Sequence, residues 1–505
     1  MKEIDFEKEK LLRKNGELQK QLDSVTKQFK SQNKKIEALS KKIEALTHKF
    51  GSSIKEIKSL KGKLSTSERK RKSLMSEKRK DKKNSDCIPL IPIDRHQFSE
   101  LMVRLAVEFY VNTRCGLRSV VVILKILKTA LGLDITIPSY KSVRNWVIKS
   151  GYAIYHEPNE EITKEDYTTI VDDSMMVGSQ RLLLILGSKS EHQGKPLSHN
   201  DVSVLGMAVR QSWDGESVSA ELDKVSTRVD HPPLYVISDN ASIMKKGISK
   251  SNLLHIRDIS HTLGMIMERV YKKEKEFISF LKDLATVKRK AVMTIEAYLL
   301  PPKQREIARF LNLANPVNWA KKMLTIFKTK LNSKERKLFA FIPKHASFIN
   351  ELDTVLSCIN TIAKKIKNEG LSRKSVKFCI EYIKQNLYTG NERMLKVAQQ
   401  MEQYLEEEVE KLPESSNVCW HASSDIIESL FGVFKDRKSP NPLYGVTPFI
   451  FLLPLYTRIG TKEGCVHFDF KHSLESVFMR DIDGWKKENL FENQVYKRTK
   501  TLNTA

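Results

Sequence analysis

The sequence predicts a mixed α/β protein with a core sheet of five strands, a large helical insertion, and a coiled coil and a helix-turn-helix in front. Three observations predict this arrangement. A heptad repeat occupies residues 8–64, three short amphipathic segments follow between 95 and 152, and β-rich segments alternate with helical ones between 165 and 271. The chain has 505 residues, which is enough for several domains.

Positive charge dominates the composition. Lys and Arg number 87 against 61 Asp and Glu, which gives a formal net charge of +26. This surplus predicts a polyanionic partner, with nucleic acid first, because each phosphate that Lys or Arg neutralises releases counterions. A membrane surface is the second candidate, but the longest apolar run, residues 447–456, is too short to span a bilayer and contains Pro454. We therefore expect DNA as the partner and no membrane.

Three further features narrow the class of protein. The 6 cysteines are scattered without a CxxC pair, which predicts reduced thiols in the cytoplasm rather than disulfides or a zinc site. The N-terminal residues are charged throughout, so no secretory signal is expected. The sequence GxxxxGK[ST] does not occur, which argues against an ATPase with that phosphate-binding loop.

The heptad repeat predicts a coiled coil over residues 1–86, including a basic extension. The hexapeptide KKIEAL occurs at 34–39 and again at 41–46, seven residues apart. One apolar seam comprises Leu22, Phe29, Ile36, Ile43, Phe50, Ile57 and Leu64, and the other comprises Leu11, Leu18, Val25, Leu39, Leu46 and Leu60. A lone helix cannot bury such a stripe, so a partner helix and a homo-oligomer are expected. A long solvated helix without a defined partner is the alternative.

A basic segment follows the coiled coil. Between Lys61 and Lys83, Lys and Arg far outnumber Asp and Glu. This pattern favours non-specific phosphate contacts beside a dimeric coil. A solvated extension of the helix is the alternative, and the two interpretations are compatible.

Three short helices are predicted within residues 87–160. Helical periodicity covers 95–113, 114–132 and 134–152, and glycines mark the ends of the second and third segments. A basic third helix after two short ones is typical of a helix-turn-helix that reads the major groove. The predicted exposed face of that helix carries Tyr140, Lys141, Arg144, Asn145 and Lys149. A small bundle that does not read DNA is the alternative.

A mixed sheet is predicted within residues 161–272. The segments, in order, are strands at 166–178, 181–187 and 201–211, a helix at 215–225, a strand at 232–242, and a strand running into a helix at 252–271. A meander of strands followed by helical crossovers gives a sheet with both antiparallel and parallel pairs and with helices on its faces.

Carboxylates follow two of these strands. Asp172 and Asp173 end the first strand, and Asp239 follows the fourth. If these strands are neighbours, the carboxylates meet at one edge of the sheet, where a late helix with Glu428 would complete a group of three. Oxygen ligands of this kind suit two Mg²⁺ or Mn²⁺ ions, which activate an attacking oxygen in phosphoryl transfer. Taken singly, each Asp could instead cap the helix that follows it.

These segments together resemble a DDE/D transposase of a bacterial insertion sequence, which has an RNase H-like core of the retroviral integrase superfamily. The resemblance is carried by VDDS at 171–174, VISDNAS at 236–242 and SSDIIESLFGVFK at 423–435. It implies that Asp172, Asp239 and Glu428 are the catalytic, metal-binding triad, with Asp173 as the alternative to Asp172. It also implies Mg²⁺ or Mn²⁺ as the cofactor.

Two shorter matches extend the resemblance. Some of these transposases carry a Tyr, an Arg, the Glu and a Lys along the late helix, and the Glu-to-Lys spacing of seven is matched by Glu428 and Lys435. The first two positions are His421 and Ser424 here, so only half of that pattern is present. Another subgroup carries an Asp-x-x-His pair after the second Asp, matched by Asp258 and His261. A helix-capping Asp and a core His are the alternative for this pair.

The rest of the chain divides into three parts. Residues 273–415 predict a helical insertion, and in some transposases of this class such an insertion holds the transposon end. Within it, Trp319 is a candidate for stacking on an unpaired base or, alternatively, a core residue. Residues 416–440 contain the Glu428 helix, in which His421 is a candidate for substrate contact or for a structural role. Residues 441–505 form a C-terminal region without a predicted function.

The resemblance implies a transposase that binds transposon-end repeats and carries out metal-dependent DNA cleavage and strand transfer in the bacterial cytoplasm, at the nucleoid. The alternative is a repurposed, non-catalytic DNA-binding protein that dimerises through the coiled coil. A purely structural coiled-coil protein is the third interpretation, and it predicts weak DNA affinity without preference for terminal repeats.

Overall fold

The computed structural model describes residues 14–27, 30, 32–33, 40, 92–94, 96–133, 135–158, 160–302, 313–414, 418–439, 441–460 and 468–503. The chain divides into two compact units, Met1–Ile88 and Pro89–Ala505. In the first unit, residues 14–27 are helical, and Leu18, Leu22 and Val25 are exposed on this helix. The other seam positions, the KKIEAL repeats and the basic segment from Lys61 to Lys83 lie outside the described residues.

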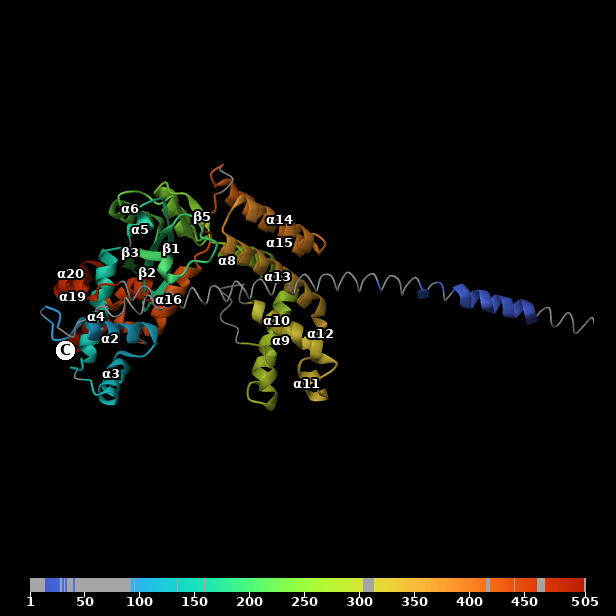
Figure 1. Cartoon of the computed structure of the whole chain (residues 1–505), viewed down its shortest axis with the longest axis horizontal. Helices are drawn as coiled ribbons and strands as arrows, with labels where there is room; N and C mark the ends of the chain where they lie inside the picture. The colour runs from blue at the N-terminus through green and yellow to red at the C-terminus, as the bar shows by residue number, and fades with distance from the viewer. Residues whose placement is uncertain are drawn as a thin grey trace, which may run out of the picture. The chain divides into compact units, whose positions relative to one another are not determined.

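Helices α2, α3 and α4 begin the second unit and pack on one another, at the three predicted places (Figure 1). Their bounds are Glu100–Asn112, Leu117–Leu131 and Tyr140–His156. Ser99 and Ser139 cap α2 and α4, because each side chain accepts a hydrogen bond from a backbone N–H in the first turn. Gly132 ends α3 with a φ of 61°, a left-handed conformation that glycine adopts without strain.

The sheet is mixed and has five strands, as predicted. Their order is β3-β2-β1-β4-β5. β1 pairs antiparallel with β2, and β2 with β3, whereas β1 pairs parallel with β4, and β4 with β5. The elements are α5 (Glu160–Thr163), β1 (Tyr167–Val177), β2 (Gln180–Lys189), η2 (His199–Asp201), β3 (Val202–Arg210), α6 (Gly215–Val229), β4 (Tyr235–Ser238), α7 (Ser242–Lys250), β5 (His255–Arg257) and α8 (Ile259–Tyr271).

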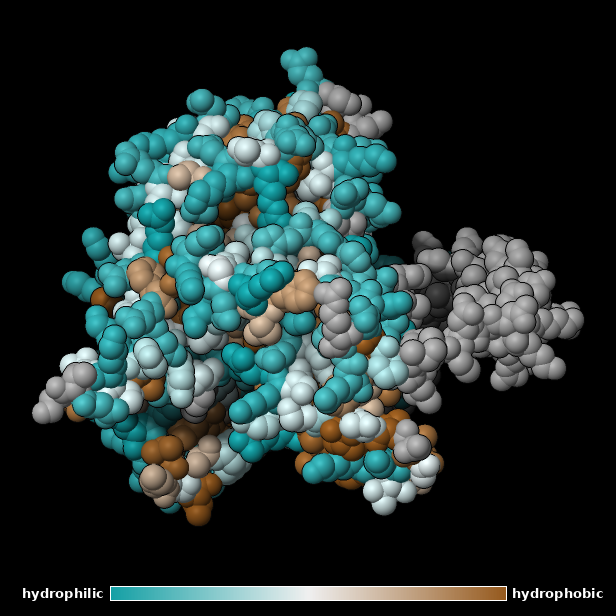
Figure 2. All heavy atoms as spheres, turned by 90° about the vertical axis from the view of Figure 1, so that its left-hand side faces the viewer, coloured by the Kyte–Doolittle hydropathy of each residue, from teal (hydrophilic) through white to brown (hydrophobic). Residues whose placement is uncertain are grey.

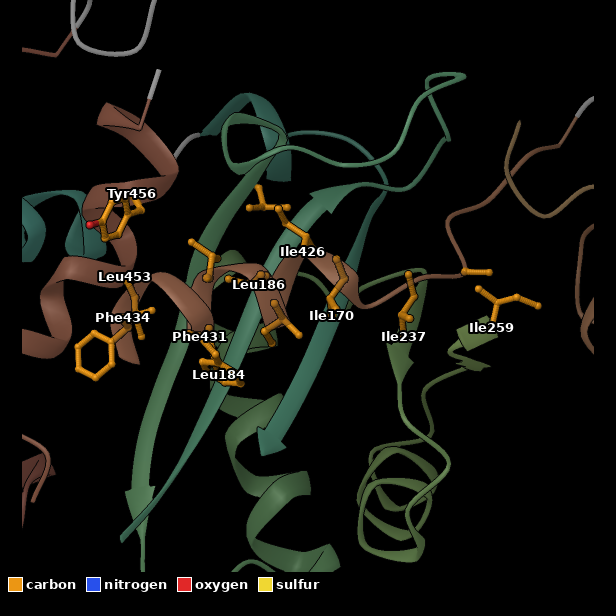
Figure 3. Packing of buried hydrophobic residues seen from close by; sticks show 14 of the residues in the cluster. Ile170, Leu184, Leu186, Ile237, Ile259, Ile426, Phe431, Phe434, Leu453 and Tyr456 are labelled. Carbon is orange, nitrogen blue, oxygen red and sulfur yellow. The ribbon is translucent and has the colours of Figure 1, made fainter. Parts of the chain in front are cut away.

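Each face of the sheet is buried against helices. Strand side chains alternate between the two faces, so neighbouring residues enter different hydrophobic clusters. Ile170 and Ile237 belong to the larger cluster, which also contains Phe431 of helix α16 (Asp425–Arg437). Figure 3 shows these residues gathered between the sheet and α16. Val171 belongs to the smaller cluster, which contains residues of α6 and α7.

The helical insertion follows α8, which packs against two of its helices, α13 and α15. Figure 1 shows the insertion helices gathered beyond the β5 side of the sheet. Their bounds are α9 (Lys275–Ala291), η3 (Ile295–Leu299), α10 (Ala314–Phe327), α11 (Ser333–Leu338), α12 (Phe341–Lys344), α13 (Ala346–Glu369), α14 (Arg373–Leu387) and α15 (Glu392–Glu410). The described part of the insertion therefore consists mainly of helices.

The C-terminal region packs on α4. Its elements are η5 (Pro442–Tyr444), η6 (Pro448–Phe451), α17 (Leu452–Ile459), α19 (Phe470–Ser476), α20 (Met479–Asn489) and α21 (Gln494–Asn503). Helix α4 contacts η6, α17, α19 and α20. The approach is closest at Gly151, where a Cβ atom would collide with the carbonyl oxygen of Phe451. Only glycine fits at this crossing, so residue 151 allows α4 and the C-terminal segment to approach closely.

The surface and the thiols agree with the composition. The face seen in Figure 2 is mainly hydrophilic, with apolar side chains gathered along its lower edge. Within the described ranges, no helix combines the length and apolar character needed to cross a membrane. Cys115, Cys358, Cys379 and Cys419 are free thiols, while Cys87 and Cys465 lie outside the described residues.

Candidate active site

Asp172 lies within β1, and Asp239 directly follows β4, the parallel neighbour of β1. The prediction that the first strand ends at Asp172 and Asp173 is wrong, because β1 continues to Val177 in its pairing with β2. Val171 of β1 is paired with Ser238 of β4, and each is followed by one of these carboxylates. By the alternation along a strand, Asp172 shares the face of Ile170, against which α16 packs. Asp172 is buried, and one oxygen of Asp239 accepts a 3.1 Å hydrogen bond from the backbone N–H of Ala241. The sheet thus brings together the first two acidic residues that the sequence predicts.

Asp173, the alternative to Asp172, falls on the other face of the sheet. It lies on the side of Val171, and its carboxylate is 3.5 Å from a guanidinium nitrogen of Arg181. Burial raises the pKa of Asp173, the charge of Arg181 opposes this rise, and the negative charge of Asp239 adds to it. The position favours Asp172 over Asp173 as the partner of a residue on α16.

Glu428 lies in the first turn of α16. Its neighbours Ile427, Leu430 and Phe431 are buried in the larger cluster, and α16 contacts β1. Packing of this apolar stripe fixes the rotation of α16 about its axis. The Glu428 side chain is 29% exposed, so its carboxylate is half-buried rather than free in solvent.

Asp258 ties the start of α16 to the start of α8. Its side chain is fully buried and accepts hydrogen bonds from the backbone N–H groups of His261 and Ser424, each at 2.6 Å. The Ser424 hydroxyl donates a further bond at 3.0 Å. Burial alone would raise the pKa of Asp258, but the bonds from His261 and Ser424 outweigh it and lower the pKa. Asp258 is therefore a charged helix cap that also holds the N-terminus of α16.

His261 connects this cap to Glu428. Its Nδ1 atom is 2.9 Å from an oxygen of Asp258, and its Nε2 atom is 3.4 Å from an oxygen of Glu428. The hydrogen bond to Asp258 raises the pKa of His261 to about 9, against the opposing effect of burial, with further help from the charges of Asp258, Glu428 and Asp239. His261 is thus a cation among carboxylates at neutral pH.

The oxygen donors of Asp172, Asp239 and Glu428 are of the type that Mg²⁺ and Mn²⁺ prefer. Among the residues that the structure describes, however, no three His, Cys, Asp or Glu side chains lie close enough to hold a metal ion together. Glu428 contacts His261 instead. The oxygen donors therefore fit such an ion in their chemistry, whereas the described side chains do not form a metal-binding group in this arrangement.

The predicted DNA-binding residues differ in their exposure to solvent. Lys435 and Lys141 are exposed, and Tyr140, Arg144 and Asn145 are half-buried. The prediction that Lys149 is exposed is wrong, because the C-terminal helices cover that end of α4 and leave only 8% of the residue accessible. Its amine lies 6.0 Å from the ring centre of Phe478, and burial lowers its pKa.

Trp319 is half-buried and packs against the core, and His421 is buried. The indole N–H of Trp319 donates a 2.9 Å hydrogen bond to the carbonyl of Leu299, and its ring lies against Phe339. His421 is 4% exposed, beside the ring of His192, and burial lowers its pKa to about 4. These surroundings agree with the structural alternative for each residue.

Sequence reasoning missed the part played by Ser424. That position departs from the late-helix pattern with which the sequence was compared, and nothing local in the sequence pairs it with Asp258. Comparisons with protein-family models and with curated proteins found no match for this chain. The geometry of the described residues is therefore what supports a function.

Proposed function

We propose that this protein is a DDE-type DNA transposase with an RNase H-like core. One observation carries the proposal: Asp172 and Asp239 follow paired positions on parallel strands, and Glu428 lies on the helix that packs across the same face. Support also comes from the strand order, in which a three-strand meander is extended by two parallel strands. The net charge of +26 suits a DNA substrate.

Asp172, Asp239 and Glu428 would hold two Mg²⁺ or Mn²⁺ ions, which supply activation of an attacking oxygen and stabilisation of the leaving oxygen. His261 is a positioning residue, because it contacts Glu428 from one side while Asp258 fixes its ring from the other. Lys435 follows Glu428 by seven residues on the same helix, about 10 Å along its axis, where it would neutralise a DNA phosphate.

The proposed partners are the transposon ends and target DNA, in the bacterial cytoplasm at the nucleoid. A homo-oligomer joined by the N-terminal heptads would bring two ends together. The proposed reaction nicks DNA to release a 3′-hydroxyl and joins that hydroxyl to the target, both at one site.

Replacement of Glu428 tests the reaction. With DNA carrying the inverted repeats that flank the gene, Glu428→Gln should lower Mg²⁺- or Mn²⁺-dependent cleavage at least about a hundredfold while end binding is retained. Asp425→Asn is the matched control, because it removes an exposed carboxylate from the same first turn of α16. Cleavage and strand transfer at the wild-type rate by Glu428→Gln would exclude the assignment.

A second candidate is a repurposed DNA-binding protein without catalysis. The contact between Glu428 and His261 favours it, since it leaves no group of three metal-ligand side chains within the described residues. This candidate predicts DNA binding that is unaffected by Mg²⁺ and no cleavage of the flanking DNA by the wild-type chain. The same cleavage assay therefore separates the two functions.

A further inference from the structure

A cleft of about 790 Å³ opens where the helix-turn-helix region meets the core. Its walls come from the α2–α3 junction, the start of α4, the end of β1, the end of α16 and the turn around Tyr444. Its volume lies within the roughly 300–1,000 Å³ of pockets that enclose a small ligand. It is distinct from the predicted carboxylates, none of which lines it.

Cations outnumber anions in the wall of this cleft. Asp436 is its one acidic residue among the described lining residues, whereas the basic ones are Arg114, Arg118, Arg144, Arg437 and Lys438. Arginine predominates, and its planar guanidinium binds phosphate oxygens through paired hydrogen bonds. This charge favours a ligand with phosphate groups over a neutral or cationic one.

Aromatic rings lie between these cations. The guanidinium carbon of Arg118 is 4.5 Å from the ring centre of Tyr140, and that of Arg437 is 4.6 Å from the ring centre of Tyr110. Tyr444 also lines the cleft and is 40% exposed. Aromatic faces and guanidinium planes together are the surfaces on which unpaired bases stack.

Two elements lead from the candidate active site to the cleft. Helix α16 begins with Glu428 in its first turn and ends at Arg437, nine residues or about 14 Å further along its axis. Strand β1 carries Asp172 and ends at Val177, another lining residue. A strand of nucleic acid that leaves the carboxylates along this path would enter the cleft within a few nucleotides, at about 3.4 Å per nucleotide of a duplex strand.

We propose that the cleft binds unpaired nucleotides of a DNA strand, with phosphates on the arginines and bases on exposed Tyr444 and half-buried Tyr140. The inference rests on the proposed function and names a part of its substrate: a single-stranded stretch beside the bond that is cut. A duplex is a poorer fit, because its bases are stacked inside and cannot reach Tyr444 or Tyr140.

Binding of a labelled oligothymidine tests this inference with the full chain. An oligonucleotide of about ten residues suits single-strand sites, which cover roughly 4–16 nucleotides, and fluorescence anisotropy gives its affinity without Mg²⁺ or Mn²⁺. Arg118→Ser and Tyr444→Ala should each weaken binding about tenfold, as expected when one phosphate contact or one stacked base is lost. Lys471→Ser and Tyr388→Ala are matched controls, because both residues are exposed and lie outside the cleft.

Photo-crosslinking gives a second readout, which reports where the strand binds and not how tightly. An oligonucleotide with 5-iodouracil should crosslink to the peptide that contains Tyr444 or Tyr140. Wild-type affinity in both cleft variants, or crosslinks confined to other peptides, would overturn the inference. Displacement of the oligonucleotide by free thymidine monophosphate at equal nucleotide concentration would also overturn it, because the cleft would then be a mononucleotide site.

The binding assay and the cleavage assay fail independently. The first contains no divalent metal and detects no cutting, so loss of this inference leaves the proposed reaction untouched. Wild-type cleavage by Glu428→Gln would remove the proposed reaction and leave the measured binding of a single strand in place.

Discussion

At the scale of single residues, Asp258 helps to position Glu428 through two helix starts. It is fully buried, and its two oxygens receive the backbone N–H groups that begin α8 and precede α16. It also orients His261, which contacts Glu428. Hydrogen bonds to a charged acceptor contribute about 1.5–3 kcal/mol each, so one carboxylate both stabilises two helix starts and sets the position of the acidic side chain.

Asp258→Asn should therefore lower the free energy of unfolding by about 2–4 kcal/mol. An amide offers one acceptor oxygen where the carboxylate offers two, so a buried donor loses its partner. Urea denaturation followed by circular dichroism measures the change, and Asp223→Asn, an exposed position on α6, is the control. An unfolding free energy equal to that of the wild type would contradict the assigned role of Asp258.

The acidic residues were predictable from the sequence because each follows an apolar, β-branched segment. Asp239 does follow the end of β4, whereas β1 continues past Asp172 to Val177, and the parallel pairing of β1 with β4 brings the two positions close. The burial of Lys149 was not predictable, because its cover comes from residues more than three hundred positions later. Ser424 was equally hidden, since its partner Asp258 lies in another segment.

At the scale of elements, an ionic cluster joins the insertion to the edge of the sheet. Glu408 of α15 is fully buried and forms an ion pair with Arg257 of β5, while Lys411 contacts Glu408 at 2.9 Å and the carbonyl of His255 at 2.7 Å. The hydroxyl of Tyr404 donates to the carbonyl of Arg257 at 3.0 Å. Since β5 leads directly into α8, this cluster links the insertion to the helix that carries His261.

Glu408→Gln should cost about 2–3 kcal/mol of stability, because two cations lose their shared buried anion while Arg257 retains Glu407. Thermal and urea unfolding measure the loss. Glu406→Gln removes an exposed carboxylate from the same helix and should change stability by less than about 0.5 kcal/mol. Equal effects of the two substitutions would show that the buried cluster does not anchor the insertion.

The sheet order β3-β2-β1-β4-β5 was left open by the sequence. The strands themselves were predictable, because periodicity and turn residues mark each one locally. The α4 contacts were not, since the helical pattern of residues 134–152 shows an apolar face without saying which distant segment covers it. The C-terminal region gave no predicted function, yet it supplies that cover through η6, α17, α19 and α20. Long-range packing of this kind depends on shape complementarity, which a single sequence does not display.

At the scale of the whole molecule, the described helix of the N-terminal unit carries an apolar stripe that is exposed. Leu18, Leu22 and Val25 are 55%, 59% and 61% exposed. These residues occupy the heptad seams, and their burial requires a second helix. Self-association through this stripe is therefore expected.

Leu18→Lys combined with Val25→Lys should convert the oligomer to a monomer, because charge on the seam opposes helix pairing. Light scattering after size-exclusion chromatography gives the mass. Glu17→Lys combined with Ser24→Lys, one position away from the seam, should leave the mass unchanged. A wild-type chain with the mass of one copy, about 58.2 kDa, would contradict the predicted coiled coil.

The contact at Gly151 bears on the distance along the DNA between a bound repeat and the cut phosphate. Helix α4 packs against η6, α17, α19 and α20, and its backbone crosses that of Phe451 too closely for any residue larger than glycine. Under the proposed function, a repeat bound by α4 would therefore lie at a set number of base pairs from the cut phosphate. Five inserted base pairs would turn that phosphate by about half a helical turn, to the opposite side of the duplex.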